Sequence, residues 1–318
     1  MDWSMKIDSA LPRPVRVILR GVGQVFFCCN AVTGFIFLTA LYVGGPIAGL
    51  AATVGVITST AAAYVLGFSE DDIDAGLYGF NGTLVGPCLF LFLENTPQLW
   101  LYVVLASILS SVVLAALIRI LTPYKIPAST SPFVLTCWMF MAAVYSFDAF
   151  TRGPVLPAPM IPAAAEAVAT MIAPDMWFTA LSKGVAEVMF ADSVIVGILF
   201  LTGIAITSFR GALMATCGTA VGVVVPSYLG ANLGLIEMGL YAFNPVLTMM
   251  AVGWVFLEPT GKSAALAFLA GILTVVCQAG LGALLTPIGL PVLTFPFVMT
   301  MWMFLYAASI SKYWSKPD

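Results

Sequence analysis

The chain alternates between long apolar stretches and short polar connections. Most stretches approach the roughly 20 residues that an α-helix needs to cross the hydrocarbon core of a bilayer. This pattern predicts an all-α polytopic membrane protein with about ten transmembrane helices. The predicted spans are residues 22–42, 46–66, 80–93, 100–121 and 133–147 in the first half, and residues 185–208, 213–229, 243–257, 264–285 and 297–310 in the second.

The composition supports a bilayer as the solvent of the chain. Of the 318 residues, 61% are hydrophobic and 8% are charged, whereas a soluble domain has about a quarter of its residues charged. The six cysteines lie in apolar stretches at irregular spacing, so we expect them to pack as small apolar side chains rather than to bind metal. The absence of histidine excludes histidine proton relays, histidine metal sites and serine–histidine nucleophile pairs. We expect no cofactor, and no nucleic acid as a partner.

Three motifs occur twice in the same order, which indicates an internal duplication. Residues 126–140 read IPASTSPFVLTCWMF and residues 290–304 read LPVLTFPFVMTMWMF, with nine of 15 aligned positions identical. GLYGFNGTL at 76–84 returns as GLYAFNPVL at 239–247, and GVGQVFF at 21–27 returns as GVAEVMF at 184–190. The predicted regions are an N-terminal interfacial arm at 1–20, a first repeat at 21–150, a Pro-rich extracytoplasmic connector at 151–183, and a second repeat at 184–318.

The spans and charges predict that the two repeats are inverted relative to each other in the membrane. Because each half has an odd number of spans, the second repeat begins on the opposite side from the first. With the N-terminus inside, ten of the twelve basic residues face the cytoplasm, and only Arg152 and Lys183 do not. The third span of each repeat is short and contains Gly or Pro, which is typical of a re-entrant segment near the midplane. The sequence therefore predicts an inverted-topology repeat with both termini cytoplasmic.

The doubled Pro-Thr motif predicts a polar lining at both mouths of one pathway. Its prolines withhold amide donors and interrupt regular helix, which leaves backbone carbonyls to face a cavity. Thr130 and Thr294 add hydroxyl groups at equivalent positions. The alternative is that both segments are Pro-kinked helix starts whose threonines bond back to the backbone. Two copies in an inverted pair favour the pathway.

Apolar side chains at equivalent positions predict a flat, narrow slot within this pathway. The paired residues are Phe27 and Phe190, Phe80 and Phe243, and Leu84 and Leu247. Two phenylalanine pairs can form the walls of the slot, and the leucines can narrow its middle. Phenylalanine is common in any membrane helix, so each ring alone is equally explained by a position in the core or against lipid.

One pair of polar side chains interrupts the apolar helices. Gln24 and Glu187 occupy equivalent positions, and a carboxyl group inside a membrane span marks a candidate functional site. Because Gln24 is an uncharged amide, we interpret both side chains as oxygen acceptors. Burial disfavours the charged form of a carboxyl group, so we expect Glu187 to be protonated when it is desolvated. The alternative is a structural carboxyl bonded to neighbouring helix ends.

Together the three repeated motifs resemble those of the urea transporter family. The resemblance rests on the doubled LP..T.PF pattern, here IPASTSPF and LPVLTFPF, and on GLYGFNGTLVG with its twin GLYAFNPVL, and it spans roughly residues 16–314. It implies a channel-like urea transporter with five transmembrane helices and one re-entrant segment per repeat. It also implies one pore per protomer and a homotrimer embedded in lipid.

The resemblance also implies the role of each pore residue. In this family a slot between stacked phenylalanines forms the selectivity filter, and ladders of oxygen acceptors flank it. By matching positions, the slot residues are Phe27, Phe80, Phe190 and Phe243, the middle is marked by Leu84 and Leu247 with Val25 and Val188 beside them, and the acceptors include Gln24, Glu187, Thr130 and Thr294.

Other classes of function remain open at this point. An ammonia channel is expected to use pore histidines, which the chain lacks. An aquaporin-like channel would account for NPV at 244–246, but its twin reads NGT and the span count is too high. A proton-coupled transporter would use Glu187 as the carrier, and a membrane enzyme would need a histidine, a carboxylate pair or a metal-ligand cluster. From the short termini we expect a multi-pass protein of the cell inner (plasma) membrane.

Overall fold

The computed structural model describes residues 3–147, 149–163 and 176–314. Within these residues the chain is helical and forms no strand beyond one isolated bridge between Leu93 and Arg152. Contacts divide the chain into two compact units: unit 1 comprises Met1–Leu121 and Ala128–Ala158, and unit 2 comprises Thr122–Pro127 and Pro159–Asp318. Part of the predicted connector, residues 164–175, lies outside the described residues.

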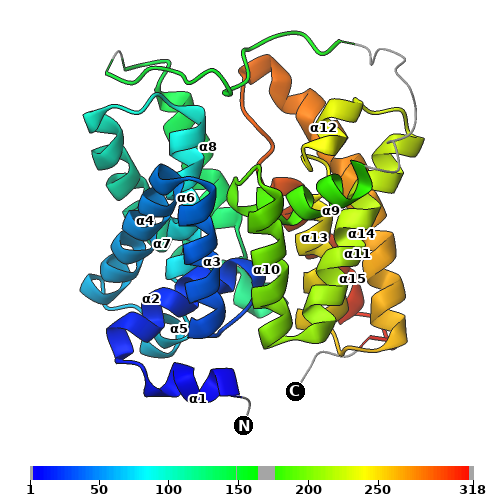
Figure 1. Ribbon diagram of the computed structural model, residues 1–318, viewed down its shortest axis with the longest axis horizontal. Coiled ribbons are helices and arrows are strands. Elements are labelled where there is room, and N and C mark those ends of the chain that lie inside the picture. Colours follow the sequence, from blue (N-terminus) through cyan, green and yellow to red (C-terminus); the bar gives the residue numbers. More distant parts are fainter. Residues whose placement is uncertain (1–2, 148, 164–175, 315–318) are drawn as a thin grey trace. The chain divides into compact units, whose positions relative to one another are not determined.

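Along the chain, α2 to α8 and α9 to α15 follow one another as two similar series of long and short helices (Figure 1). In unit 1 the elements are α1 (Trp3–Ala10), α2 (Arg13–Gly23), η1 (Gln24–Phe26), α3 (Ala31–Gly44), α4 (Pro46–Val65), α5 (Glu70–Asp74), α6 (Gly79–Phe92), α7 (Pro97–Leu121) and α8 (Ser131–Ala143). In unit 2 they are η2 (Thr122–Tyr124), α9 (Trp177–Ala186), η4 (Glu187–Met189), α10 (Val194–Thr207), α11 (Phe209–Tyr228), α12 (Leu233–Glu237), α13 (Phe243–Met250), η5 (Ala251–Val255), α14 (Gly261–Leu285), η6 (Thr286–Ile288) and α15 (Phe295–Ser309).

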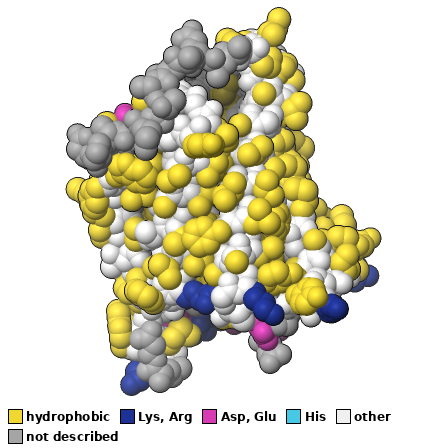
Figure 2. All heavy atoms as spheres, turned by 90° about the vertical axis from the view of Figure 1, so that its right-hand side faces the viewer, with side chains coloured by type: hydrophobic (Ala, Val, Ile, Leu, Met, Phe, Trp, Pro, Cys, Tyr) yellow, Lys and Arg dark blue, Asp and Glu magenta, His cyan; other side chains and the backbone are white. Residues whose placement is uncertain are grey.

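The helices have the lengths and surfaces of a membrane protein. Four described helices, in the ranges Pro46–Val65, Pro97–Tyr124, Phe209–Tyr228 and Gly261–Ile288, are long and apolar enough to cross a bilayer, and two bent pairs raise the number to six. The other predicted spans are apolar helices of 10–17 residues. On the face drawn in Figure 2, hydrophobic side chains form a broad band with Lys and Arg side chains along its lower edge. The prediction of an all-α membrane protein is confirmed, whereas length and composition support fewer complete spans than ten.

Each unit has a sharp bend within its first predicted span. α2 with η1 meets α3 at a bend of 76°, and α9 with η4 meets α10 at a bend of 74°. In the third spans, α6 runs through Pro87 without a break, whereas α13 is followed directly by a π-helix at Ala251–Val255. The apolar pattern conceals the real break, since apolar residues continue across it. After the bend Asn30 caps α3, and its side-chain oxygen accepts hydrogen bonds from the amides of Val32 (2.9 Å) and Thr33 (3.2 Å).

The cap at Asn30 allows a first prediction. Asn30→Ala is expected to lower the free energy of unfolding by about 1 kcal/mol, because two amides at the start of α3 lose their acceptor. Asn30→Ser, which installs the residue found at the equivalent position 193, is expected to retain most of the stability. Thermal unfolding in detergent measures both variants, with the exposed Ser309→Ala as control. Equal stability of Asn30→Ala and the unmodified chain would contradict the role of the cap.

The N-terminal segment is attached to unit 1 by a buried ion pair. Asp8 is fully buried, accepts a hydrogen bond from the amide of Ala31 (2.8 Å) and pairs with Arg20 at 2.5 Å. Arg20 also donates to the carbonyl of Asp74 (2.9 Å). α1 is thereby held against α3, and α2 begins at Arg13, inside the segment predicted as an interfacial arm.

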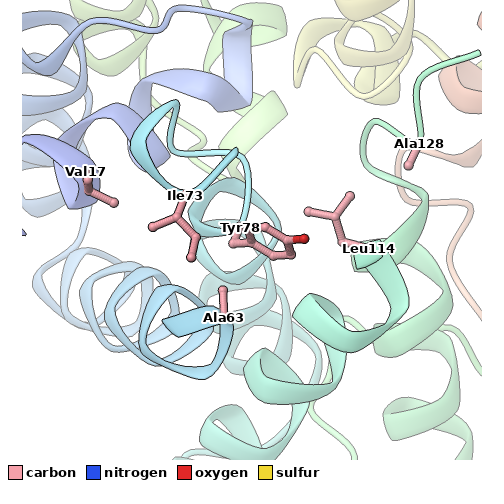
Figure 3. Close-up of a cluster of buried hydrophobic side chains, with 6 residues drawn as sticks. All are labelled: Val17, Ala63, Ile73, Tyr78, Leu114 and Ala128. Atoms are coloured by element: carbon pink, nitrogen blue, oxygen red, sulfur yellow. The ribbon is translucent and has the colours of Figure 1, made fainter. Parts of the chain in front are cut away.

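A small apolar cluster in unit 1 lies where α2, α4, α5 and α7 meet the start of α6 (Figure 3). Its labelled members are Val17, Ala63, Ile73, Tyr78, Leu114 and Ala128. Unit 2 has a smaller cluster that contains Ala180 and Ile236, at the positions equivalent to Val17 and Ile73. Each cluster supports the short helix that precedes the predicted slot helix, α6 or α13.

Glycines let the neighbouring helices approach the slot helices closely. A Cβ atom on Gly55 of α4 would lie 2.0 Å from the carbonyl oxygen of Gly82 in α6. In unit 2, a Cβ on Gly218 of α11 would lie 2.5 Å from the Cα of Val246 in α13. Small residues at such a seam allow backbone-to-backbone packing, which fixes a membrane helix without relying on the hydrophobic effect.

Candidate functional site

The break in unit 1 positions Gln24 and Phe27. Gln24 opens the short helix η1, and its amide nitrogen Nε2 donates to the carbonyl of Ala75 (2.9 Å), which directs the amide group. Phe27 ends η1 in the left-handed region with φ of 60°. Val25, between them, is buried, whereas Gln24 and Phe27 are half-buried. The break therefore carries one polar and one aromatic residue, both half-buried, on one short helical turn.

The break in unit 2 repeats this geometry with Glu187 in place of glutamine. Glu187 opens η4, Val188 is buried, and Phe190 ends η4 with φ of 62°. The nearby basic residue Lys183 pairs with Asp192 (2.6 Å). Among the described residues, none forms a hydrogen bond or ion pair with the Glu187 carboxyl. Glu187 is thus not the counter-ion of Lys183.

The slot helices pack against these breaks. Phe80 and Leu84 lie one turn apart on α6, which contacts both η1 and α8. Phe243 and Leu247 have the same relation on α13, which contacts η4 and α15. Both leucines are fully buried, while Phe243 is half-buried. Each unit therefore brings its predicted phenylalanines, leucine and polar residue onto elements in contact.

The Pro-Thr motifs turn sharply before their helices begin. Ser129 and Leu293 have φ of 49° and 50°, directly before Thr130 and Thr294. Both threonines are 2% exposed, and each is the N-cap residue of its helix without making a side-chain cap hydrogen bond.

One interaction joins the two copies of the motif and was not anticipated from the sequence. The indole nitrogen of Trp302, in the second copy, donates to the carbonyl of Pro127, in the first (2.8 Å). Tyr124 and Tyr306 pack edge to face nearby, with ring centroids 6.2 Å apart. All four residues belong to unit 2, so the start of the first copy is packed with the second. The tryptophan that both copies carry, Trp138 and Trp302, was the feature of the sequence that could have indicated this interaction.

Unusual backbone conformations also match between the two halves. Every described residue with positive φ has a partner 163 or 164 positions away, and the pairs are Phe27 and Phe190, Gly67 and Gly230, Gly76 and Gly239, Lys125 and Gly289, and Ser129 and Leu293. A left-handed conformation costs roughly 1–2 kcal/mol for a residue other than glycine. Strain of this kind persists where the surroundings require it and is concentrated at functional sites.

Comparison with known proteins identifies the family. A model of the family described as urea transporter matches residues 15–309. The chain belongs to the urea transporter family. Urea transporter 1 of Ovis aries and that of Capra hircus are each 29% identical over 296 residues, and that of Mus musculus over 295. Each alignment covers 91% of this chain and 75% of the relative.

Family membership settles the broad class of function. The urea transporter family consists of membrane transporters, not enzymes, and urea is the substrate of the family. The resemblance inferred from the three repeated motifs is confirmed. The two sets of side chains described above, one in each unit, are therefore candidates for the path of the permeant.

Proposed function

We propose that the chain conducts urea passively through a pathway to which both repeats contribute. The matched left-handed phenylalanines, Phe27 and Phe190, carry this proposal. A bulky residue in this region is an outlier, and two at equivalent positions indicate that the ring orientation is required. With Phe80 and Phe243 these rings form the walls of an apolar slot, and Leu84 and Leu247 with Val25 and Val188 line its middle.

The side chains fit the chemistry of urea. Urea is planar and neutral, so a narrow aromatic slot admits it edge-on. Its four N–H donors lose water in the slot, and a line of oxygen acceptors offsets this loss. Gln24 and Glu187 supply acceptors beside the rings, and Thr130 and Thr294 supply hydroxyls at the helix starts. An ion finds no replacement for its hydration shell at the apolar constriction and is excluded.

Glu187 acts in this account as a neutral acceptor. The Nε2 of Gln24 donates to the carbonyl of Ala75, which leaves Oε1 for the permeant. The residue equivalent to Ala75 is Met238. A protonated Glu187 donates to this carbonyl in the same way and presents its second oxygen, so the acid and the amide become equivalent. No charge then lies in the slot.

The assembly and topology complete the proposal. We place an inverted-topology repeat of five transmembrane helices and one re-entrant segment per half, about ten in total, in the cell inner membrane. Both termini are cytoplasmic. The repeats occupy 21–150 and 184–318, flanked by the arm at 1–20 and the connector at 151–183, and three protomers form a homotrimer with one pore each.

A proton-coupled transporter is the second candidate. The observation in its favour is the carboxyl of Glu187, which has no bonded partner among the described residues. Gln24, at the equivalent position, argues against a proton-coupled transporter, because this side chain does not titrate and yet occupies the same place in the other repeat.

The proposal is tested by the range of solutes that cross proteoliposomes containing the purified protein. Stopped-flow light scattering compares urea, thiourea, formamide, glycerol and ammonia with protein-free vesicles. We expect fast flux of urea, which saturates at high concentration, and little flux of glycerol, which is not planar. Glycerol flux equal to urea flux would exclude a planar slot.

A further inference from the structure

The side chain of Asp8 joins the two helices on either side of the break in unit 1. Its Oδ1 accepts hydrogen bonds from the amide of Ala31 at the start of α3 (2.8 Å) and from Nε of Arg20 in α2 (3.0 Å). Its Oδ2 accepts from Nη2 of Arg20 (2.5 Å). Because α2 precedes the break and α3 follows it, this fully buried carboxylate holds both arms of the 76° bend.

The helix α1 makes a second contact with the start of α3, one turn before Asp8. Nδ2 of Asn30, the residue that caps α3, donates to Oγ of Ser4 (3.0 Å). Ser4 and Asp8 are four residues apart and therefore lie on one face of α1. They are also its buried residues. The face of α1 that is turned inward thus contacts the point at which the chain resumes its helix after the break.

Arg20 connects Asp8 with the candidate acceptor Gln24. Nη1 of Arg20 donates to the carbonyl of Asp74 (2.9 Å), and Nε2 of Gln24, one turn further along, donates to the carbonyl of Ala75 (2.9 Å). Two consecutive carbonyls of one turn therefore receive the two side chains. A carboxylate that pairs with two nitrogens of a guanidinium group fixes its orientation. Asp8 thereby orients the group that holds the turn to which Gln24 is bonded.

Unit 2 also has an ion pair across its break, built from other residues. Lys183, equivalent to Arg20, pairs with Asp192 (2.6 Å), which lies between η4 and α10. Asp192 occupies the position equivalent to Cys29. In both units a cation one turn before the polar side chain is paired with a carboxylate at the other side of the break. In unit 1 that carboxylate comes from α1.

We propose that Asp8 is a positioning residue for urea transport, which through Arg20 fixes the bend between α2 and α3 and so holds Gln24 and Phe27 in place. The inference rests on the proposed function, in which Gln24 is an acceptor and Phe27 a wall of the slot. A buried ion pair gains little stability over apolar packing, because both charges lose water. The place of this pair at the bend is explained by the geometry that it fixes. The helix α1 is then part of the transport machinery.

Moving the carboxylate to the position that it has in unit 2 tests the inference. Asp8→Asn retains the size of the side chain but removes its charge, and is expected to lower urea permeability about tenfold, the factor that a hydrogen bond to a charged group is worth. In this background Cys29→Asp supplies a carboxylate where unit 2 has Asp192. Cys29 lies close enough to Arg20 to interact with it electrostatically, so most of the flux is expected to return. Cys29→Asn, equal in size but uncharged, is the matched control and is expected to restore none.

The ratio of urea to glycerol flux separates a positioning role from a merely structural one. Both fluxes are measured in proteoliposomes and normalised to the inserted protein, and the Tm of each variant is measured in detergent. Asp8→Asn is expected to lower the ratio, because Phe27 is no longer held, and Cys29→Asp is expected to restore it. Thr260→Ala removes the cap of α14 in unit 2. It is expected to lower the Tm and to leave the normalised urea flux and the ratio unchanged.

Each outcome decides the matter. A loss of urea flux in Asp8→Asn that Cys29→Asp restores and Cys29→Asn does not restore supports the inference. Flux equal to or above that of the unmodified chain overturns it while the proposed function stands. A loss that Cys29→Asp does not restore, or that Cys29→Asn restores equally, also overturns it. An unmodified chain without urea flux overturns the proposed function, and the inference with it. Should Asp8→Asn fail to fold, Arg20→Lys with and without Cys29→Asp provides the same comparison, because it installs the pair of unit 2.

Discussion

Replacing Glu187 by leucine is expected to lower urea permeability about tenfold to hundredfold. Leucine removes an oxygen acceptor, and an N–H donor left unpaired in an apolar site costs about 1–3 kcal/mol. Glu187→Gln is expected to leave the permeability near that of the unmodified chain, because glutamine already serves at the equivalent position 24. Urea flux into proteoliposomes, normalised to the amount of inserted protein, measures both variants.

The pair of substitutions separates an acceptor from a proton carrier. If Glu187 carried protons, glutamine would be as harmful as leucine. A matched control is Gln24→Glu, which makes the first repeat resemble the second and is expected to retain transport. Loss of flux in Glu187→Gln with normal folding would contradict the proposed passive mechanism.

Replacing Phe27 or Phe190 by glycine is expected to abolish discrimination between urea and glycerol. The ring that forms the wall is lost, and shape discrimination in an apolar pocket is worth about 1–3 kcal/mol, or tenfold and more. Glycine accepts positive φ without strain, so the backbone of the break is expected to remain intact. Alanine removes the same ring but remains strained at this conformation.

Glycine and alanine together make this prediction specific. Both variants are expected to lose selectivity, measured as the ratio of urea to glycerol flux. Phe27→Gly is expected to exceed Phe27→Ala in free energy of unfolding by about 1 kcal/mol. An unchanged flux ratio in either variant would show that the rings do not form the selective wall.

The hydrophobic pattern predicted the helical class and most helix positions, because lipid imposes one clear requirement on every span. It missed the breaks at Phe27 and Phe190. Apolar residues continue through both breaks, and a left-handed phenylalanine has no signature in composition. Once the repeats are aligned, polar Gln24 and Glu187 mark the breaks, although only the structure shows the bend.

The residues of the candidate site could be proposed from the sequence wherever the internal repeat gave equivalent positions. Equivalent positions singled out the aromatic and polar residues, which each unit places on contacting elements. Sequence reasoning missed that Oδ1 of Asn81 accepts from the amide of Phe133 and Oδ1 of Asn244 from that of Phe297. Hydrogen bonds between helices depend on packing that sequence spacing does not reveal. A buried asparagine at the same place in both copies was the available signal. The family itself was recognised from three short motifs, which the match over residues 15–309 confirms.

Urea flux in the presence and absence of an imposed pH gradient tests the central claim most directly. Purified protein in proteoliposomes is exposed to a urea gradient with the inside acidic, alkaline or equal to the outside. A passive slot with a neutral Glu187 predicts the same initial rate of urea flux in all three conditions, and no urea accumulation beyond equilibrium. Urea accumulation against its gradient, driven by the proton gradient, would contradict the account.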